Sequence, residues 1–263
     1  MRSAWTALLR LLALLLLAAF ALQLWFLLRI ALMIVVDPQS TTFQRSEAWR
    51  LLVEEHRILW SQQWTDYARI SPSLKRAVIA SEDAAFAEHG GVDWEAIEKA
   101  WERNQRAEAR LEKLNEQLER RAGRRGAGAT APIRPPALAP AKVVGGSTIT
   151  QQLAKNLFLA GERSLARKGQ EFVITMMLET VLSKRRILEI YLNNVEWGEG
   201  LFGAQAAARH YFRVDASALG AAQASRLAVM LPAPKRFEKR PGSPYVVGRA
   251  ATVAARMGAV DPP

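Results

Sequence analysis

The amino-acid sequence predicts a mainly helical protein behind a single N-terminal membrane-spanning helix, and three observations carry that prediction. Residues 11–36 are apolar except for Gln23 and Arg29, which exceeds the roughly 20 residues needed to cross a bilayer. Further along the chain, apolar side chains recur at helical spacing. Helix-capping residues precede two of these segments, at 71–72 and 147–148. We find no internal repeat.

The N-terminal apolar run also predicts how the chain lies in a membrane. Arg2 and Arg10 precede the run, so the positive-inside rule places the N-terminus in the cytoplasm and everything after Asp37 outside. A cleaved signal peptide is the alternative, with residues 19–21 as its small-residue cleavage site. The apolar sequence continues well past that site, which favours an uncleaved anchor.

Composition narrows the choice of partners. The formal net charge is +11 and the isoelectric point is near 10.4, which suits nucleic acid, acidic lipid headgroups or a phosphate-bearing substrate. A membrane anchor argues against nucleic acid. The chain has no cysteine, so disulfides and thiolate chemistry are excluded.

After the anchor, aromatic and apolar side chains recur every third or fourth residue, which predicts one or two amphipathic helices with a common face. This face would pack on the domain core, or it would rest on the membrane interface. His56 would be a packed residue within it. The face consists of Trp49, Val53, His56, Trp60, Trp64 and Tyr67.

The next helix is expected to begin with Ser71 as its N-cap and Pro72 as its first residue, and to end at the acidic pair Glu82 and Asp83. A half-buried carboxyl group there would have a raised pKa, which suits a general base or acid working near neutral pH. The alternative is an ordinary helix end with both acids solvated.

A predicted insertion follows. Residues 92–101 predict a helix with Trp94, Ile97 and Trp101 facing inward. The densely charged sequence up to residue 121 predicts an exposed amphipathic helix or a partly disordered one. Residues 122–141 are rich in Gly, Pro, Ala and Arg, cannot bury enough apolar surface to order themselves, and are expected to be mobile.

The block at residues 145–159 combines features of an anion site. Its two glycines allow the backbone to approach a ligand, and Ser147 or Thr148 can cap the helix that follows. Free N–H groups at a helix start attract anions. Gln151 and Lys155 lie four residues apart and would form a polar, cationic wall facing a sugar phosphate. A capped helix with a solvated lysine is the alternative.

A second charged group comes shortly afterwards. Arg163, Arg167 and Glu171 are spaced four residues apart, so they can share one helix face. They could form a surface salt bridge of little energetic value, or they could clamp a diphosphate in a cleft. The remaining sequence predicts an apolar helix at 172–182, a helix end at 189–194, a glycine-rich turn at 198–203 and packing helices at 204–211 and 216–231.

Four motifs stand in a characteristic order: Glu82-Asp83-x-x-Phe86-x-x-His89-x-Gly91, the block at 145–159, Arg167-Lys168-x-x-Glu171 and Leu188-Glu189-x-Tyr191-Leu192-Asn193. Together they resemble glycosyltransferase family 51, the peptidoglycan glycosyltransferases, over residues 71–234. The single anchor resembles the monofunctional members. Bifunctional members carry a downstream transpeptidase domain, whose Ser-x-x-Lys and Lys-Thr-Gly motifs do not occur here.

The resemblance implies a lysozyme-like, two-lobed, mainly helical domain that polymerises lipid II into β-1,4-linked glycan with inversion and release of undecaprenyl diphosphate. Glu82 would be the general base. Glu171 would stabilise the reacting centre or help to hold a divalent cation, Mg²⁺ or Mn²⁺. Lys155, Arg163 and Arg167 would bind the diphosphate. The other matched residues would shape the cleft or bind substrate: Asp83, Phe86, His89, Ser147, Thr148, Gln152, Asn156 and Lys168.

Three regions are therefore expected: the cytoplasmic N-terminus and anchor at 1–36, a juxtamembrane amphipathic region at 37–70, and a glycosyltransferase domain at 71–263 with an insertion at about 100–142. The catalytic domain would lie in the periplasm, held by one span in the bacterial inner membrane, and act in cell wall biogenesis and cell shape. Its expected partners are lipid II, the nascent glycan strand and the membrane, with cell-wall synthesis or division proteins left open.

Two rival classes differ in chemistry. A lysozyme-like hydrolase or lytic transglycosylase also uses a carboxylic acid, but it cleaves glycan and has no need of a diphosphate clamp. The cationic group at Lys155, Arg163 and Arg167 therefore favours synthesis. A membrane-tethered binding protein with a dead active site is disfavoured by the presence of both Glu82 and Glu171.

Overall fold

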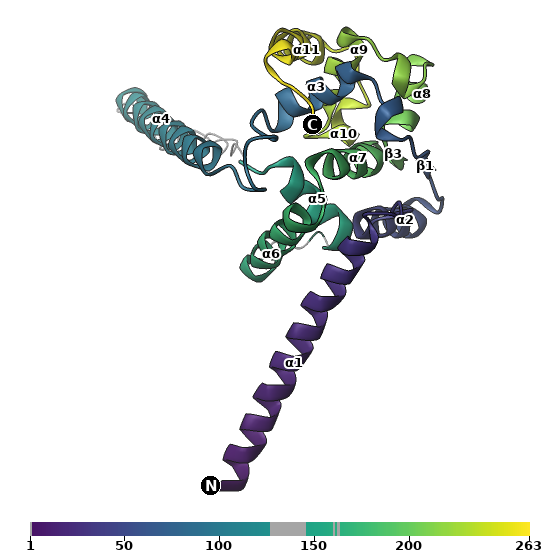
Figure 1. The fold of residues 1–263 in the computed structure, drawn as a ribbon. Helices are drawn as coiled ribbons and strands as arrows, with labels where there is room; N and C mark the ends of the chain where they lie inside the picture. The colour runs from purple at the N-terminus through teal and green to yellow at the C-terminus, as the bar shows by residue number, and fades with distance from the viewer. Residues whose placement is uncertain (1, 127–145, 160, 162–163) are drawn as a thin grey trace. The chain divides into compact units, whose positions relative to one another are not determined.

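The computed structural model describes residues 2–126, 146–159, 161 and 164–263, and its mainly helical fold agrees with the prediction (Figure 1). Its contacts divide the chain into a main unit, residues 1–92 with 148–263, and a second unit, residues 93–147. The helices of the main unit are α1 (Arg2–Leu32), α2 (Thr42–Glu55), α3 (Pro72–Glu82), α5 (Ile149–Phe158), α6 (Leu165–Val181), α7 (Lys184–Asn194), α8 (Ala204–Phe212), α9 (Ala221–Met230), α10 (Pro234–Phe237) and α11 (Pro244–Arg256), with 3₁₀ turns η1 (Tyr67–Arg69), η2 (Ala216–Ala218) and η3 (Met257–Ala259).

Helix α3 runs through the core of the main unit, because one of its faces is apolar throughout. Leu74, Ala77, Val78 and Ile79 are almost fully buried, and α3 packs against α9, which in turn packs against α11. The helix begins where the sequence predicted: the Ser71 hydroxyl accepts the N–H of Ser73, and proline occupies the first turn. A rigid helix thus carries its last residues to the end of the core.

The glycine-rich turn expected after α7 connects two strands of a small sheet. Strand β3 (Leu201–Phe202) pairs in parallel with β1 (Ser61–Gln62) and antiparallel with β2 (Glu196–Gly198). Glycine is required at position 200, where φ is +67° and a Cβ atom would lie 2.4 Å from the backbone oxygen of Leu59. The sheet joins the juxtamembrane segment to the core.

Within the described residues, α1 is the one helix long and apolar enough to cross a membrane, over Ala4–Leu32. Only 6% of its most apolar window is buried, unlike the core helix of a soluble domain. Its last turns differ, because Phe26, Ile30 and Met33 are buried in the same core as α3 and α7. Arg186 of α7 donates through Nε to the backbone oxygen of Met33 at 2.8 Å.

The prediction of one amphipathic face from Trp49 to Tyr67 is wrong. Helix α2 ends at Glu55, and His56 turns the chain with φ at +53°. Trp49 and Val53 are exposed, at 67% and 54%, and His56 is exposed as well. The helical spacing was counted across a helix end, beyond which the chain forms a loop and strand β1, so the later aromatic residues cannot share that face.

In the second unit, helix α4 (Trp94–Gly126) is continuous through the charged segment. Of the two alternatives, a helix is therefore correct, and pairs four residues apart such as Glu102 with Arg106 line its surface. The expectation that Trp94 and Trp101 face inward is wrong, because they are 68% and 66% exposed. Residues 127–145, where most of the expected mobile tract falls, lie outside the described residues, and the domain boundaries given above stay a prediction.

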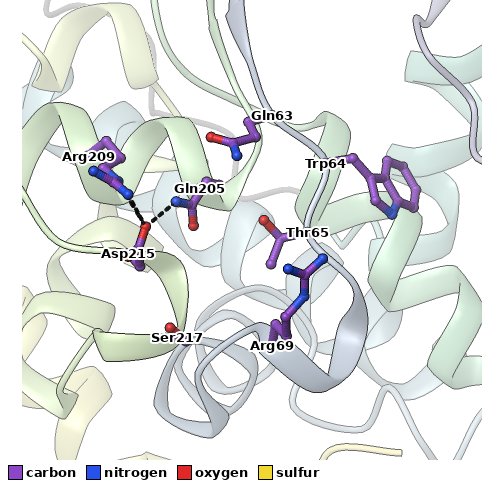
Figure 2. Close-up of a pocket in the computed structure, with 8 residues that line it drawn as sticks. All are labelled: Gln63, Trp64, Thr65, Arg69, Gln205, Arg209, Asp215 and Ser217. Atoms are coloured by element: carbon purple, nitrogen blue, oxygen red, sulfur yellow. Dashed lines mark hydrogen bonds and ion pairs between the residues drawn. The ribbon is translucent and has the colours of Figure 1, made fainter.

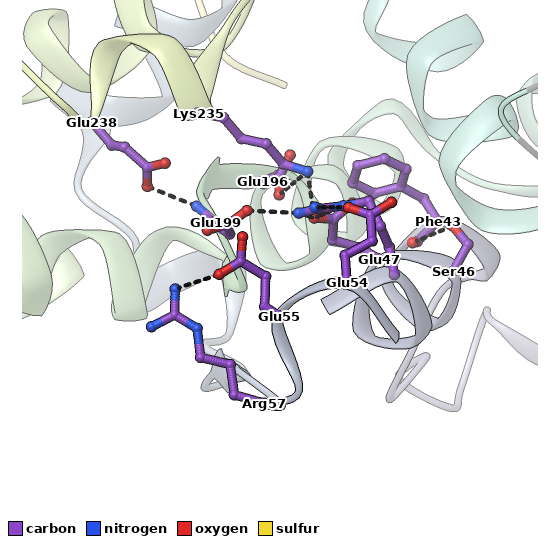
Figure 3. A network of polar contacts seen from close by, with 11 residues as sticks. Phe43, Ser46, Glu47, Glu54, Glu55, Arg57, Glu196, Glu199, Lys235 and Glu238 are labelled. Carbon is purple, nitrogen blue, oxygen red and sulfur yellow. Dashed lines mark hydrogen bonds and ion pairs between the residues drawn. The ribbon is translucent and has the colours of Figure 1, made fainter. Parts of the chain in front are cut away.

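A network of charges joins α2 to the β2–β3 turn and to α10 (Figure 3). Arg50 of α2 pairs with Glu47 and reaches Glu199 Oε1 at 2.6 Å. Lys235 of α10 pairs with Glu47 and lies 3.8 Å from Glu196 Oε1. Glu47 and Glu196 are both buried. The network therefore holds the juxtamembrane helix on the core through buried, partly compensated charge.

Candidate active site

Glu82 is the last residue of α3, and its carboxyl group is half-buried. Burial raises its pKa, the hydrogen bond from Gln152 lowers it, and the negative charge of Asp83 raises it, with a net upward shift. A carboxyl group with a raised pKa holds a proton better at neutral pH than an ordinary one, as a general base must. The sequence prediction named this residue and this direction.

A hydrogen-bonded chain orients the Glu82 carboxyl group. Gln152 of α5 donates through Nε2 to Glu82 Oε2 at 3.0 Å. The Tyr191 hydroxyl of α7 donates to Gln152 Oε1 at 2.8 Å, which fixes which end of the amide faces the acid. Tyr191 is fully buried and its pKa is raised well above the usual value by burial, so it stays a donor. Tyr191 was not among the predicted site residues, although the last motif contains it.

Asp83 differs from its neighbour because both of its oxygens are engaged inside the protein. Oδ2 accepts the N–H of Ile149, the first residue of α5, at 2.9 Å, and Oδ1 lies 2.8 Å from His89 Nε2. The backbone N–H of Gly91 donates to His89 Nδ1, so His89 Nε2 carries the proton and donates to Asp83. Asp83 and His89 therefore join the segment after α3 to the start of α5.

Lys184 and Glu179, which no sequence motif singled out, hold the same segment. Lys184 donates to the backbone oxygen of His89 at 2.6 Å and pairs with Glu179 at 2.8 Å. Gly91 has φ at +88°, and a Cβ atom there would lie 2.7 Å from Glu179 Cγ, so the turn closes against α6 only with glycine. The Thr148 hydroxyl donates to the Gly91 oxygen at 2.7 Å. The backbone on both sides of Glu82 is thus fixed.

Helix α5 begins at a capping box, which changes the role expected for Gln151. Thr148 Oγ1 accepts the N–H of Gln151, and Gln151 Oε1 accepts the N–H of Thr148, each at 3.2 Å. Gln151 is buried, so the prediction that it lines a polar wall with Lys155 is wrong. The capping box turns Gln151 inward and leaves Gln152 to reach Glu82. Ser147 is exposed and precedes the cap.

The second predicted cluster lies along α5 and α6. Glu171 is buried and accepts from Arg167 Nη1 at 2.9 Å and from Lys168 Nζ. Lys155 reaches solvent, yet burial among protein atoms lowers its pKa; Glu171 raises it, and the positive charges of Arg167 and Lys168 lower it further. Three cations thus surround one carboxylate, which leaves net positive charge for an anion. Arg163 lies outside the described residues.

Two observations relate this cluster to the rest of the site. Among the described atoms, Arg167 Nε is buried and has no hydrogen-bond partner, so it is a donor still to be satisfied. Gln152, which binds Glu82, and Lys155, whose pKa the charge of Glu171 raises, are three residues apart on α5 and so lie on nearly the same face. Helix α5 therefore contributes one residue next to the acid Glu82 and one residue to the cationic cluster.

The remaining predicted residues differ in exposure. Phe86 is fully buried, with the Lys184 ammonium 4.6 Å from its ring centroid, so it supports the site through packing. His89 and Asn156 are partly exposed. Direct substrate contact by any of these residues stays a prediction.

A pocket of about 280 Å³ lies elsewhere, between the segment before α3, helix α8 and the turn at η2 (Figure 2). Gln63, Arg69, Gln205 and Arg209 are among its lining residues, and none of the predicted site residues is. Gln205 and Arg209 both donate to Asp215, at 2.5 and 2.8 Å. These lining groups hold the turn at η2, and the pocket is separate from the candidate active site.

Comparisons with known proteins agree with this arrangement. The model of the transglycosylase family matches residues 53–113 and 136–258. Proteins named biosynthetic peptidoglycan transglycosylase in Burkholderia orbicola (strain MC0-3) and Burkholderia pseudomallei (strain K96243) are each 49% identical over 246 residues, which is 94% of this chain and 87% and 84% of theirs. The family model covers most of the chain, including Glu82, α5 and α6, and the chain belongs to the transglycosylase family.

Proposed function

We propose that the protein is a peptidoglycan glycosyltransferase that polymerises lipid II into β-1,4-linked glycan strands and releases undecaprenyl diphosphate. The relatives' names supply the substrate class. The observation that carries the proposal is the layout of α5: Gln152 holds an acid with a raised pKa, and Lys155 faces a cluster with surplus positive charge. A glycan hydrolase needs the first of these groups and not the second.

In the proposed reaction Glu82 accepts the proton of the acceptor sugar's 4-hydroxyl group. The freed oxygen attacks C1 of the lipid-linked donor from the face opposite the diphosphate, so a C1–O4 bond forms as the C1–O bond to the diphosphate breaks, with inversion. The leaving electron pair ends on undecaprenyl diphosphate. Lys155, Arg167 and Lys168 stabilise the charge that develops there, as charge-assisted hydrogen bonds do. Glu171 orders the Arg167 and Lys168 side chains.

A divalent cation at Glu171 fits this arrangement poorly. Arg167 and Lys168 already bind the two oxygens of that buried carboxylate. Mg²⁺ and Mn²⁺ prefer several free oxygen ligands, and two neighbouring cations oppose a third. The proposed steps are therefore assigned to the side chains of this chain alone.

The proposal includes the membrane. Helix α1 would anchor the enzyme in the bacterial inner membrane, with the main unit in the periplasm, because its apolar side chains are exposed along most of its length. A lipid-linked substrate then reaches the enzyme within the bilayer surface. The enzyme is expected to have no transpeptidase activity.

Detergent-solubilised full-length protein incubated with labelled lipid II tests the proposed function. We expect polymer and free undecaprenyl diphosphate. A parallel incubation with isolated glycan strands separates the rival class, because a hydrolase or lytic transglycosylase would shorten them. Shortened strands without polymer would contradict the proposal. If neither polymer nor shortened strands form, the result would favour a binding protein without activity.

Removing one cation of the cluster should weaken use of the lipid diphosphate. Lys155→Ala and Arg167→Ala are each expected to lower kcat/KM for lipid II by roughly 10- to 100-fold, since a hydrogen bond to a charged group is worth about 1.5–3 kcal/mol. Arg249→Ala removes an equal charge from the exposed face of α11 and should leave the rate unchanged. Wild-type rates in both site variants would place the diphosphate elsewhere.

The pH dependence of polymerisation should report the contact between Gln152 and Glu82. Gln152→Leu removes a hydrogen bond that lowers the pKa of Glu82, so the acid limb of kcat/KM should move to higher pH. Tyr191→Phe leaves the amide free to turn and should move the limb less, in the same direction. An acid limb that stays in place or moves to lower pH in Gln152→Leu would show that Glu82 does not set it.

A further inference from the structure

Helix α1 contains one uncharged polar residue in its apolar run, Gln23, and its side chain is bound to helix α6. Gln23 Nε2 donates to Gln170 Oε1 at 2.9 Å, and Gln170 Nε2 donates to Gln23 Oε1 at 3.0 Å. Each amide therefore satisfies a donor and an acceptor of the other. Both side chains are half-buried.

Gln23 belongs to the face of α1 that packs on the other helices of the main unit. Phe26, Ile30 and Met33 follow it at intervals of three or four residues and are buried, while the rest of the helix is largely exposed. The Phe26 ring meets Phe158 of α5 with centroids 5.3 Å apart. The end of the anchor thus packs against α6 and against Phe158 of α5, and the described residues of α1 before Gln23, from Ala4 on, are exposed.

The depth of Gln23 in the bilayer makes the hydrogen bonds of this pair important. The Arg29 guanidinium lies 5.4 Å from the Trp25 ring centroid, a pair of residue types that is common at the membrane interface. Gln23 is six residues before Arg29, roughly 9 Å further toward the bilayer centre at 1.5 Å per residue. An amide at that depth is costly unless it is hydrogen-bonded, so separating α1 from α6 would expose two unsatisfied amides.

On α6, Gln170 lies within one turn of Arg167, Lys168 and Glu171. A helix turn is rigid, so fixing the depth and rotation of Gln170 also fixes those of its neighbours. We propose that the Gln23–Gln170 pair is a positioning contact, which fixes the cationic cluster of α6 relative to the membrane anchor and so relative to the diphosphate of a membrane-bound lipid. Its kinetic consequence rests on the proposed function, whereas the contact itself does not.

Cross-linking tests the contact independently of activity. The chain has no cysteine, so Gln23→Cys with Gln170→Cys introduces the only two thiols. In liposomes, a short thiol-reactive cross-linker should join them. Gln23→Cys with Phe172→Cys is the matched control, because residue 172 points to the opposite side of α6, and it should react far less. Equal reaction of the two pairs would overturn the proposal even if the enzyme polymerises lipid II normally.

Kinetics in liposomes test the positioning role. Gln23→Leu and Gln170→Leu should each raise KM for lipid II about fivefold to tenfold, the change expected from losing two interhelical amide hydrogen bonds, with kcat within about twofold. The double variant should be no worse than either single one, because the pair acts as a unit. Gln39→Leu, an exposed glutamine just beyond α1, should leave KM unchanged.

Cross-linking and kinetics together distinguish a failure of the positioning role from a failure of the proposed function. Cross-linking with an unchanged KM in the leucine variants would make the pair a simple tether and overturn the positioning role. Additive losses in the double variant would do the same. A wild-type enzyme that makes no polymer would contradict the proposed function, and the cross-linking result would still report the contact.

Discussion

Replacing Glu82 by glutamine is expected to lower polymerisation of lipid II by roughly 100- to 10,000-fold, the usual loss when a catalytic base is removed. The same variant should be at least as stable as the wild type. The pKa of Glu82 is raised in the fold, so its charged form destabilises the protein as the pH rises past the ordinary value of 4.5, and glutamine removes that effect. Initial rates and thermal midpoints at neutral pH measure both consequences.

Glu88→Gln is the matched control for this prediction. Glu88 lies six residues further along the same segment and is exposed, so the variant should keep both its rate and its thermal midpoint. Near-normal turnover in Glu82→Gln would remove Glu82 from the proposed mechanism. A lowered thermal midpoint would instead mean that the lost activity reflects a damaged fold.

Glutamine in place of Glu196 should stabilise the protein at neutral and alkaline pH. Burial raises the pKa of Glu196 to about 7; the charge of Lys235 opposes this and the charges of Glu47 and Glu238 add to it. Among the described atoms, Glu196 Oε1 is buried without a hydrogen-bond partner. The Lys235 ammonium lies 3.8 Å from it, beyond hydrogen-bond distance (Figure 3). The folded state therefore holds this proton more tightly than the unfolded chain does.

The sign and size of the effect follow from this difference. The wild type should lose stability as the pH rises from about 4.5 to about 7, and the loss should then stay constant. At about 1.4 kcal/mol per pH unit the loss is about 3.5 kcal/mol at most. Glu196→Gln should abolish it, so the variant's thermal midpoint should exceed that of the wild type by several degrees at pH 8 and match it near pH 4.5.

Glu54→Gln provides the comparison for Glu196. Glu54 belongs to the same network through its ion pair with Arg50, but its side chain is 59% exposed, so its replacement should change stability by no more than about 0.5 kcal/mol at any pH. A pH profile of Glu196→Gln that runs parallel to the wild type would show that Glu196 is not protonated on folding. The other ion pairs of the network between α2, the β2–β3 turn and α10 would then account for its contribution to stability.

The sequence by itself determined those features that depend on neighbours along the chain. The start of α3 at Ser71 and the cap of α5 at Thr148 were predictable, because capping requires only a few adjacent residues. The motif order was enough to indicate the family, while the roles that it implies for Glu82 and Glu171 stay a prediction. The apolar run at 11–36 was enough to predict α1. Prediction from local periodicity failed where a helix ended without a sequence signal, as α2 does at His56.

Only the tertiary structure decided how the acids and amides divide their tasks. Asp83 accepts a hydrogen bond from the first residue of α5, 66 residues away, which leaves Glu82 as the acid available to a substrate. The capping box turns Gln151 inward, so Gln152 reaches Glu82, and Tyr191 fixes it from α7. Side-chain direction depends on the phase of each helix and on partners distant in sequence, and neither is encoded in a short motif. For the same reason, the amide contact between the anchor and α6 emerged only once the chain was folded.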